Sequence, residues 1–368
     1  PEIIGATRTW DFCPCTQSGS VNITSLADGL RSLNPDWSGD RVYQEARKIV
    51  GACMQAITYQ VWLPLILGPA GLEMLGTYTG YDDHVNPTIS NEFATAAMRF
   101  GHTLIPPVVF RLDENWNPIP EGHLHLHQAF FAPERMMKDG GMDPILRGLL
   151  YNGVRDRSRN PPLNAELTER LFAMAHELAL DLASLNVQRG RDHGLPGYSE
   201  YAYKFCGLGS SPHPDSFEDF SSRISSKDTR ERLRKVYGHP GNVDLFTGAV
   251  LEDLLPEARV GPTFACIIAD QFKRLRSGDR FWYEARGVFT SAQLAEIRRA
   301  GSSLSRVICE TADNITEVPM NAFLRPKAAA DLISCSAIPK LSLAAWVECP
   351  ANLFEVNRFE PGSYPKET

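Results

Sequence analysis

Apolar residues recur at helical spacing along most of the chain, and three stripes are long enough to predict individual helices. Members of each stripe lie three or four residues apart, which leaves one apolar face on a helix of 3.6 residues per turn. The first stripe is expected to end near Pro64, because proline removes a backbone donor and does not continue a helix. Its members are Val42, Ala46, Ile49, Cys53, Ile57 and Val61.

The second stripe surrounds a histidine. Thr88 is expected to cap the start of this helix, and Pro106 and Pro107 follow its end. Arg99 and His102 lie three residues apart, so their side chains project from adjacent turns on one face. An imidazole there can bind a metal ion, and the guanidinium beside it suits a carboxylate. The stripe consists of Ile89, Phe93, Ala97, Phe100 and Leu104.

The third stripe predicts one continuous helix that begins after Asn164 and reaches at least Leu185. Asn164 suits an N-cap, because its side chain can accept a hydrogen bond from an unpaired backbone N–H group. Asn186 follows the stripe directly, and Arg189 lies three residues further on. The carbonyl of Asn186 could accept the Nδ1–H of a metal-bound histidine, which would fix the tautomer of that ring. The stripe consists of Leu167, Leu171, Met174, Leu178, Leu182 and Leu185.

Strand patterns are scarce, so the sequence predicts a mainly α fold with one large helical domain, expected to span residues 25–349. Residues 1–24 show no convincing period and contain Gly, Ser and Pro, which predicts an irregular N-terminal arm. An irregular C-terminal tail is expected over residues 350–368. Further helices are expected at residues 230–237, 250–255, 262–275 and 291–300.

The composition supports a folded domain and argues against several classes of protein. The chain has 368 residues and is 43% hydrophobic, enough for a sizeable core. Its net charge of −7 argues against a nucleic-acid partner. No membrane span is expected, because the apolar run from Val61 to Leu67 is far shorter than the roughly 20 residues that a span needs. The start shows neither an initiator methionine nor a signal-peptide pattern, which we interpret as a processed or truncated end.

The sequence has two further histidine-containing features that could form a functional site. His123, His125 and His127 alternate with leucines, so an extended segment would point all three in one direction. Such a set can bind zinc or copper, but the pattern supplies no fourth ligand, and a solvated strand or loop face is the favoured interpretation. Asp192 and His193 are expected to be structural groups, because no nucleophile motif accompanies them.

Two segments carry a family resemblance. Residues 99–105 (RFGHTLI) and 185–198 (LNVQRGRDHGLPGY) resemble the proximal-helix signatures of the animal haem peroxidases, the family of myeloperoxidase and thyroid peroxidase. The resemblance extends from about Ser25 to Trp346, nearly the whole chain. Further matching stretches lie at residues 33–37, 43–51, 141–149 and 278–284.

This resemblance implies a haem-dependent oxidoreductase that uses hydrogen peroxide to oxidise halide, phenolic or tyrosyl substrates. It implies a b-type haem, which can be covalently linked in a full-length family member. His102 would be the axial ligand of the iron, Asn186 would orient its ring, and both arginines would lie near the haem propionates. The cofactor-binding residues expected are Arg99, His102, Leu182, Leu185, Asn186 and Arg189.

The resemblance covers only the proximal part of the family's haem domain. Family members also have a distal part, upstream of the position that matches residue 25. It holds a histidine in an Asp-His-Asp motif, an arginine, acidic residues that link to haem, and a calcium-binding loop. None of these matches here, so we expect no distal catalytic residue and no calcium site, and we interpret the domain as N-terminally truncated.

Two functional interpretations follow from the unmatched distal part. In the first, a missing N-terminal segment or a second chain completes a peroxidase. In the second, the chain is a catalytically inactive truncated isoform or pseudo-peroxidase that acts as a binding or structural protein.

The cysteines and two glycosylation sequons indicate a secretory compartment. Asn-Ile-Thr sequons begin at Asn22 and Asn314, and the chain has eight cysteines. Disulfides are typical of secreted proteins, and peroxide chemistry would connect the protein with the response to oxidative stress. The disulfides implied by the resemblance are Cys206–Cys266 and Cys309–Cys335. The cysteines left unassigned are Cys13, Cys15, Cys53 and Cys349.

Overall fold

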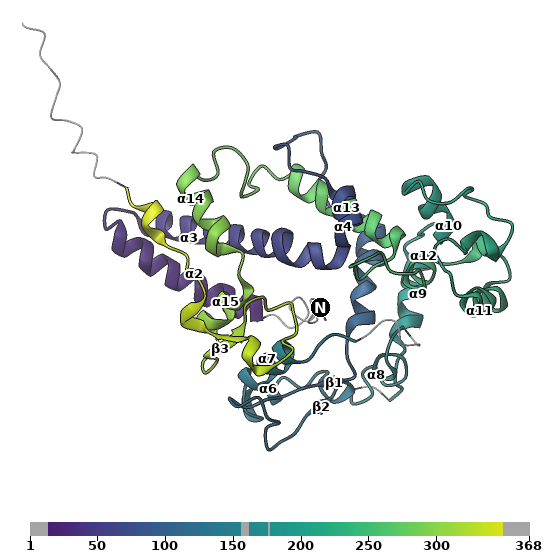
Figure 1. Ribbon diagram of the computed structural model, residues 1–368, viewed down its shortest axis with the longest axis horizontal. Helices are drawn as coiled ribbons and strands as arrows, with labels where there is room; N and C mark the ends of the chain where they lie inside the picture. Colours follow the sequence, from purple (N-terminus) through teal and green to yellow (C-terminus); the bar gives the residue numbers. More distant parts are fainter. Residues whose placement is uncertain (1–13, 156–161, 176, 349–368) are drawn as a thin grey trace, which may run out of the picture.

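The computed structural model describes residues 14–155, 162–175 and 177–348, and helices dominate it (Figure 1). The sheets among these residues are two small antiparallel pairs. β1 (Val108–Val109) pairs with β2 (Leu124–His125), and β3 (Glu317–Pro319) pairs with β4 (Leu332–Ser334). The expected mainly α fold class is confirmed.

The described chain opens with α2 (Pro14–Leu33), which packs against α3 (Gly39–Ala56). The expected irregular arm is therefore wrong from residue 14 onward, while residues 1–13 lie outside the described part. Ile23, Leu26 and Leu30 are three or four residues apart and turn toward the core. The helical spacing of apolar residues begins only at Ile23, so the sequence did not predict the earlier turns of α2. The expected tail over residues 350–368 also lies outside the described residues.

The first predicted helix does not stop at Pro64. α3 runs into a π-helical turn, η1 (Ile57–Trp62), and then into α4 (Leu63–Leu75). The wider turn lets the Leu63 N–H donate to Thr58 O, five residues back. Pro64 then occupies the first turn of α4, where its missing N–H needs no helical partner.

The continuous helix formed by α3, η1 and α4 bends at Gly68. Gly68 has a φ of 62°, and a Cβ there would lie 2.5 Å from the carbonyl oxygen of Pro256, so glycine is required. Gly39–Leu75 is the one helix among the described residues that is long and apolar enough to cross a membrane. Length and composition are weak evidence, because the core helix of a globular protein passes the same test. α4 has this core role, with Leu63, Ile66 and Leu67 fully buried.

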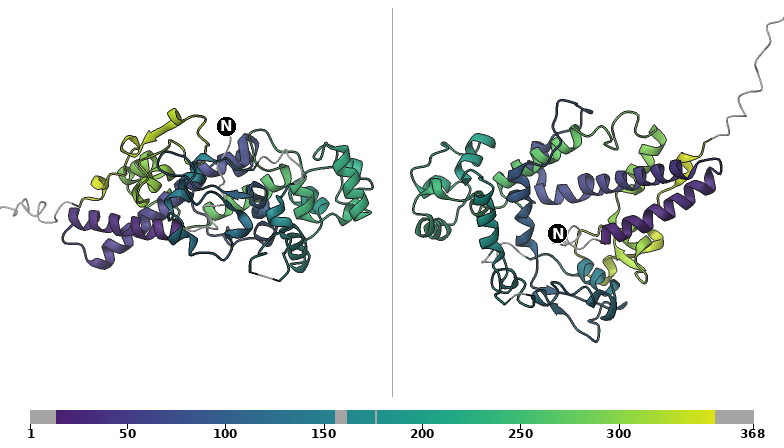
Figure 2. Two further views of the ribbon diagram at one scale, coloured as in Figure 1. Left: turned by 90° about the horizontal axis from the view of Figure 1, so that it is seen from below. Right: turned by 180° about the vertical axis from the view of Figure 1, so that it is seen from behind.

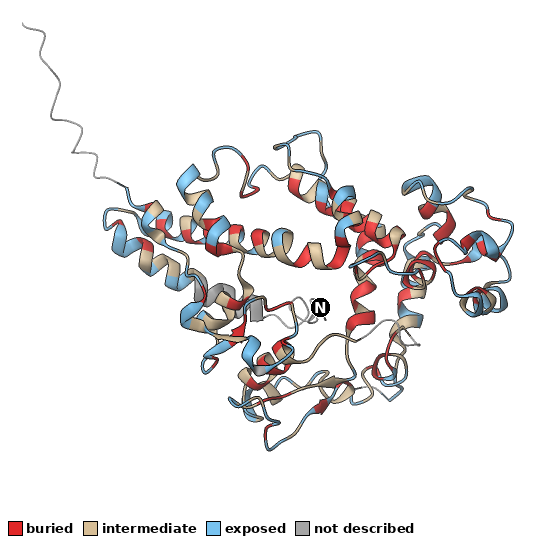
Figure 3. Cartoon of the chain, in the orientation of Figure 1, coloured by how far each residue is buried: buried red, intermediate tan, exposed pale blue. Residues whose placement is uncertain are grey.

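The largest apolar core lies where α4 packs against α13 (Pro262–Ser277), and buried residues gather there in Figure 3. α12 (Leu245–Val250) and the segment that carries His102 complete this core. A second core lies between α2, α3 and η10 (Leu343–Trp346). The histidine segment thus rests on the larger core, which fixes the position of its backbone.

Three of the four further helical predictions are confirmed by α11 (Lys227–Tyr237), by α13, and by α14 (Ser291–Glu296) continuing into η7 (Ile297–Gly301). The prediction at residues 250–255 is wrong, because α12 ends at Val250 and the chain turns away. The remaining helices outside the candidate site are η3 (Leu126–Gln128), α6 (Arg135–Lys138), α7 (Asp143–Tyr151), α10 (Tyr198–Glu200), η4 (Tyr201–Phe205), η5 (Phe217–Phe220), η6 (Pro240–Asn242), α15 (Leu304–Thr311), η8 (Ala329–Asp331) and η9 (Cys335–Ala337).

Both expected disulfides are confirmed. Cys206–Cys266 ties the end of η4 to α13, and Cys309–Cys335 ties α15 to η9. Among the leftover cysteines, Cys53 is unpaired, and burial raises the pKa of its thiol to about 12. A thiol held protonated in this way is a poor nucleophile. The pairing of Cys13, Cys15 and Cys349 lies outside the described residues and side chains.

Candidate cofactor site

The segment that carries His102 is two short helices rather than the predicted single α-helix. α5 (Asn91–Thr95) is capped by Ser90, not by Thr88. Ala96, with φ −128° and ψ −63°, interrupts the helix, and η2 (Ala97–Leu104) continues as a 3₁₀-helix. Side chains three residues apart eclipse one another in a 3₁₀-helix, so Arg99 and His102 face the same way more closely than an α-helix would allow.

The predicted continuous helix from Asn164 to Leu185 is also wrong. α8 (Ala165–Thr168) is capped by Asn164 as expected, but it ends within one turn. The chain then forms an irregular excursion closed by a bridge between Leu171 and Leu180. α9 (Leu182–Asp192) begins anew after Asp181, whose Oδ1 accepts hydrogen bonds from the N–H groups of Ala183 and Ser184, at 2.8 and 3.3 Å.

The apolar stripe over this region therefore does not form a buried helical face. Met174 and Leu178 are 68% and 78% exposed, and Leu185 is 42% exposed. Leu182 packs with Leu167 and Leu171 in a small apolar cluster. Of the two leucines expected to contact the cofactor, Leu182 is half-buried and Leu185 lies at the surface.

Helix α9 lies alongside the α5–η2 segment in both the front and back views (Figures 1 and 2). His193, at the end of α9, holds this arrangement: its Nδ1 lies 2.8 Å from Asn91 Oδ1, and its backbone O accepts from Asn91 Nδ2 at 3.1 Å. Thr95 Oγ1 lies 3.5 Å from the same ring nitrogen. These contacts agree with the expected structural role of His193, whereas Asn91 and Thr95 were not predicted, because nothing local in the sequence links them to His193.

Three predicted site residues come together between η2 and α9. The side-chain nitrogen of Asn186, Nδ2, lies 2.9 Å from His102 Nδ1. Arg99 Nη1 donates to Asn186 Oδ1 at 2.8 Å. Asn186 is fully buried, so the two hydrogen bonds satisfy an amide that would otherwise be costly to bury.

The orientation of the Asn186 amide differs from the expected one. Because Oδ1 accepts from Arg99, the amide presents its NH₂ group, not its carbonyl, to His102. Nδ1 of His102 is then an acceptor, and the proton of the neutral ring resides on Nε2.

Electrostatics keep His102 neutral. Burial, with a smaller contribution from the positive charge of Arg99, lowers the pKa of His102 from 6.5 to about 4. A neutral imidazole is the form that binds metal ions. The pKa of Arg99 is itself lowered, by burial and by the charge of Arg189. Arg189 itself forms a 3.3 Å ion pair with Asp192, so Arg99 is the guanidinium whose charge acts on the histidine and favours an anionic group there.

The three alternating histidines do not converge on one point. His123 accepts a hydrogen bond from the Arg111 backbone N–H at 3.2 Å and packs edge-on to Phe110. His125 and His127 instead face Glu166. A metal site built from all three histidines is therefore wrong.

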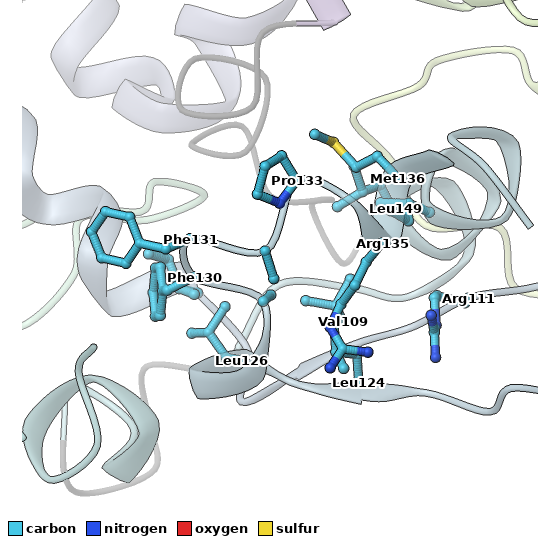
Figure 4. Close-up of a pocket in the computed structure, with 14 residues that line it drawn as sticks. Val109, Arg111, Leu124, Leu126, Phe130, Phe131, Pro133, Arg135, Met136 and Leu149 are labelled. Carbon is cyan, nitrogen blue, oxygen red and sulfur yellow. The ribbon is translucent and has the colours of Figure 1, made fainter. Parts of the chain in front are cut away.

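An apolar pocket of about 320 Å³ lies near this region and was not anticipated from the sequence (Figure 4). Ile105, three residues after His102, forms part of its wall, and Phe130 and Phe131 form another part. Arg111 borders it, held by a 2.9 Å ion pair with Asp139. The residues that line the pocket come from separate short elements, so no periodic pattern in the sequence predicts the pocket.

The mainly helical fold and the approach of Asn186 to His102 across two helices agree with the resemblance to the haem peroxidases. The animal haem peroxidase family model matches residues 24–323, and the chain belongs to this family.

Curated relatives are similar over most of this chain. It is 50% identical over 341 residues to the peroxidasin homolog of Mus musculus, which covers 92% of this chain and 23% of the relative. It is 48% identical over 325 residues to thyroid peroxidase of Homo sapiens, covering 88% of this chain and 34% of the relative. The chain thus spans about a quarter to a third of the length of these relatives.

Solved structures support the same fold. Peroxidase A from Dictyostelium discoideum superposes with a TM-score of 0.70 at 32% identity, covering 83% of this chain and 56% of that one. The fatty acid alpha-dioxygenase of Oryza sativa superposes with a TM-score of 0.63 at 17% identity, covering 85% and 57%. The second similarity concerns the fold alone.

Proposed function

We propose that this chain is the proximal part of a haem-dependent peroxidase, an oxidoreductase that uses hydrogen peroxide to oxidise halide, phenolic or tyrosyl substrates. The observation that carries the proposal is the 2.9 Å contact between Asn186 Nδ2 and His102 Nδ1, which joins side chains 84 residues apart. Family membership and the peroxidasin and thyroid peroxidase relatives support the same activity.

The residues present fit a haem group. His102 is neutral and would bind the iron through Nε2, and Arg99 and Arg189 would pair with the haem carboxylates. Ligation through Nε2 requires the proton on Nδ1, so Asn186 would turn its carbonyl toward the ring. Pairing of Arg99 with a carboxylate would release Oδ1 for that turn. The haem, when bound, supplies the iron centre that reacts with peroxide.

In this proposal the chain's own residues supply the proximal side of the haem site. Asn186 would hold the imidazole in one tautomer and at one tilt, and the buried η2 backbone would keep His102 in place to bind the haem. Breaking the peroxide bond also requires a proton acceptor and donor over the opposite face of the haem. The sequence contains no Asp-His-Asp motif for that role.

We therefore infer that a further segment, from the longer protein or from a second chain, supplies the distal residues. Support comes from the relatives, which extend well beyond the part that this chain matches, since the chain covers 23% of the peroxidasin homolog and 34% of thyroid peroxidase. A covalent haem link and a calcium site would belong to that segment.

A secretory location is part of the proposal. Two disulfides are typical of an oxidising compartment, and Asn314, which begins one sequon, is exposed. Glycosylation at Asn314 and a role in the response to oxidative stress are consistent with this location.

The test is a peroxide-dependent oxidation assay on the haem-loaded chain, alone and together with the segment that precedes it in the longer protein. We expect turnover close to that of free haem for the chain alone. Adding the distal segment should raise it by about 10²–10⁴-fold, the usual contribution of positioned acid–base groups. An inactive pair with normally bound haem would favour the pseudo-peroxidase alternative. Robust turnover by the chain alone would contradict the missing distal half.

A further inference from the structure

A charged pair joins the end of α9 to the start of α12. Arg191 Nε donates to Asp244 Oδ1 at 2.9 Å, and Arg191 Nη2 donates to Asp244 Oδ2 at 2.7 Å. One guanidinium therefore holds both oxygens of the carboxylate. Because both groups are planar, such a two-point pair fixes their relative orientation as well as their distance.

Asp244 is itself held in place on the α12 side of the pair. Its side chain is 15% exposed, and the OH of Tyr237, at the end of α11, donates to Oδ2 at 2.9 Å. The backbone that follows α9 pairs with the backbone before α12, through a bridge between Gly197 and Asp244 and a 2.8 Å hydrogen bond from the Tyr198 N–H to Val243 O. The carboxylate is thus a fixed partner for Arg191.

Helix α12 supports both halves of the candidate site. It packs against α9, which carries Asn186, and against η2, which carries His102 (Figure 1). Arg191 lies five residues after Asn186, so the two side chains leave α9 in directions about 140° apart. His193 joins the end of α9 to α5, whereas Arg191 joins the same end to α12. The charged pair therefore restrains α9 in a direction that His193 does not.

We propose that Arg191 and Asp244 are positioning residues, which fix the rotation of α9 about its axis and so keep Asn186 in contact with His102. The contact between Asn186 Nδ2 and His102 Nδ1 is 2.9 Å, and a displacement of about 0.5 Å would take it outside the normal range of a hydrogen bond. The effect on haem ligation rests on the proposed function. The effect on the contact between the two side chains is a property of the haem-free chain.

The first test is ¹⁵N NMR spectroscopy of the haem-free chain with labelled histidine side chains. The Nδ1 resonance of His102 reports the hydrogen bond from Asn186, and Asn186→Leu defines the resonance without that bond. Arg191→Lys keeps the positive charge but cannot form the two-point pair. We expect it to move the resonance at least halfway toward the Asn186→Leu position, and Asp244→Asn should have the same effect.

Arg299→Lys is the matched control. Arg299 forms an equivalent two-point pair with Glu296, at 2.8 and 2.6 Å, and its side chain is 50% exposed, against 57% for Arg191. This second pair lies in α14 and η7, so the control should leave the His102 resonance unchanged. An unchanged resonance in Arg191→Lys and Asp244→Asn, or an equal shift in the control, would overturn the proposal.

The second test measures the affinity for haem and the reduction potential of the bound haem. Arg191→Lys should weaken binding about tenfold, the lower end of the effect of losing a group that orients a metal ligand, and should shift the potential in the same direction as Asn186→Leu does. Added to Asn186→Leu, it should change neither quantity further, because it acts through Asn186. Additive effects of the two substitutions would contradict the positioning role. Failure of the original chain to bind haem, with the NMR shifts as predicted, would remove the proposed function and leave the positioning role supported.

Discussion

The Asn186 side chain joins the two helices of the candidate site, η2 and α9, through its polar contacts. Its carbonyl accepts from Arg99 and its amide nitrogen faces His102, so the arginine determines which end of the amide the histidine meets. The family resemblance, not the apolar spacing, predicted that these residues belong to one site. It could not predict the amide orientation, because that depends on a hydrogen bond from a residue 87 positions away.

The lowered pKa of His102 makes stability depend on pH in a defined direction. Its pKa is about 4 in the folded chain and 6.5 in the unfolded chain, so between these values the unfolded state binds more protons. The stabilising contribution is therefore complete above pH 6.5 and is lost as the pH falls toward 4.

Urea denaturation at pH 7 and pH 4 measures this contribution. The original chain should lose roughly 2–3 kcal/mol more stability between the two pH values than a His102→Gln variant, at about 1.4 kcal/mol per pKa unit. His84→Gln, at an exposed position, should behave like the original chain. An equal loss in the original chain and in His102→Gln would show that His102 is not held neutral by its surroundings.

At the scale of elements, local interactions determine which of two similar apolar patterns forms a continuous helix. The stripe from Leu167 to Leu185 has good helical spacing, yet Asp181 caps a new helix within it and Phe172 adopts a left-handed φ of 60°. The stripe from Val42 to Val61 does form a helix, because its apolar side faces a core. Periodicity alone does not reveal whether a partner surface exists, which is why one stripe was predicted correctly and the other was not.

The cap of α9 can be tested directly. Asp181→Ala removes the acceptor for two backbone N–H groups and the negative charge at the helix start, and should destabilise the chain by about 1 kcal/mol. Asp181→Asn keeps the acceptor and should restore most of the loss. Chemical denaturation measures both variants. If Asp181→Ala were as stable as the original chain, the helix start would have to be fixed by packing instead.

At the scale of the whole molecule, the described helices are held by two large apolar cores and by the disulfides Cys206–Cys266 and Cys309–Cys335. The pairing of these cysteines was predictable only from the family resemblance, since spacing does not determine connectivity. The mainly α class followed from the scarcity of strand patterns. The continuation of the helix through the π-helical turn η1 and past Pro64 did not follow from the sequence, because a single proline ordinarily predicts a helix end.

The two disulfides should differ in their contributions to stability. Cys206–Cys266 closes a loop of 60 residues and Cys309–Cys335 closes one of 26. In the chain-entropy model the longer loop contributes about 4 kcal/mol and the shorter about 3.5 kcal/mol. Replacing both cysteines of each pair by alanine and comparing the free energies of unfolding tests this order. A larger loss from removing Cys309–Cys335 would indicate that native-state contacts, rather than loop length, dominate.

The central claim concerns haem ligation by His102, and the most direct measurement is a haem titration of the chain followed by absorption and electron paramagnetic resonance spectroscopy. We predict a saturable Soret band with the signature of an axial histidine. His102→Ala should lose that signature, Asn186→Leu should weaken binding, and His193→Gln should retain the axial-histidine signature. Binding with unchanged spectra in His102→Ala, or no specific binding by the original chain, would contradict the account.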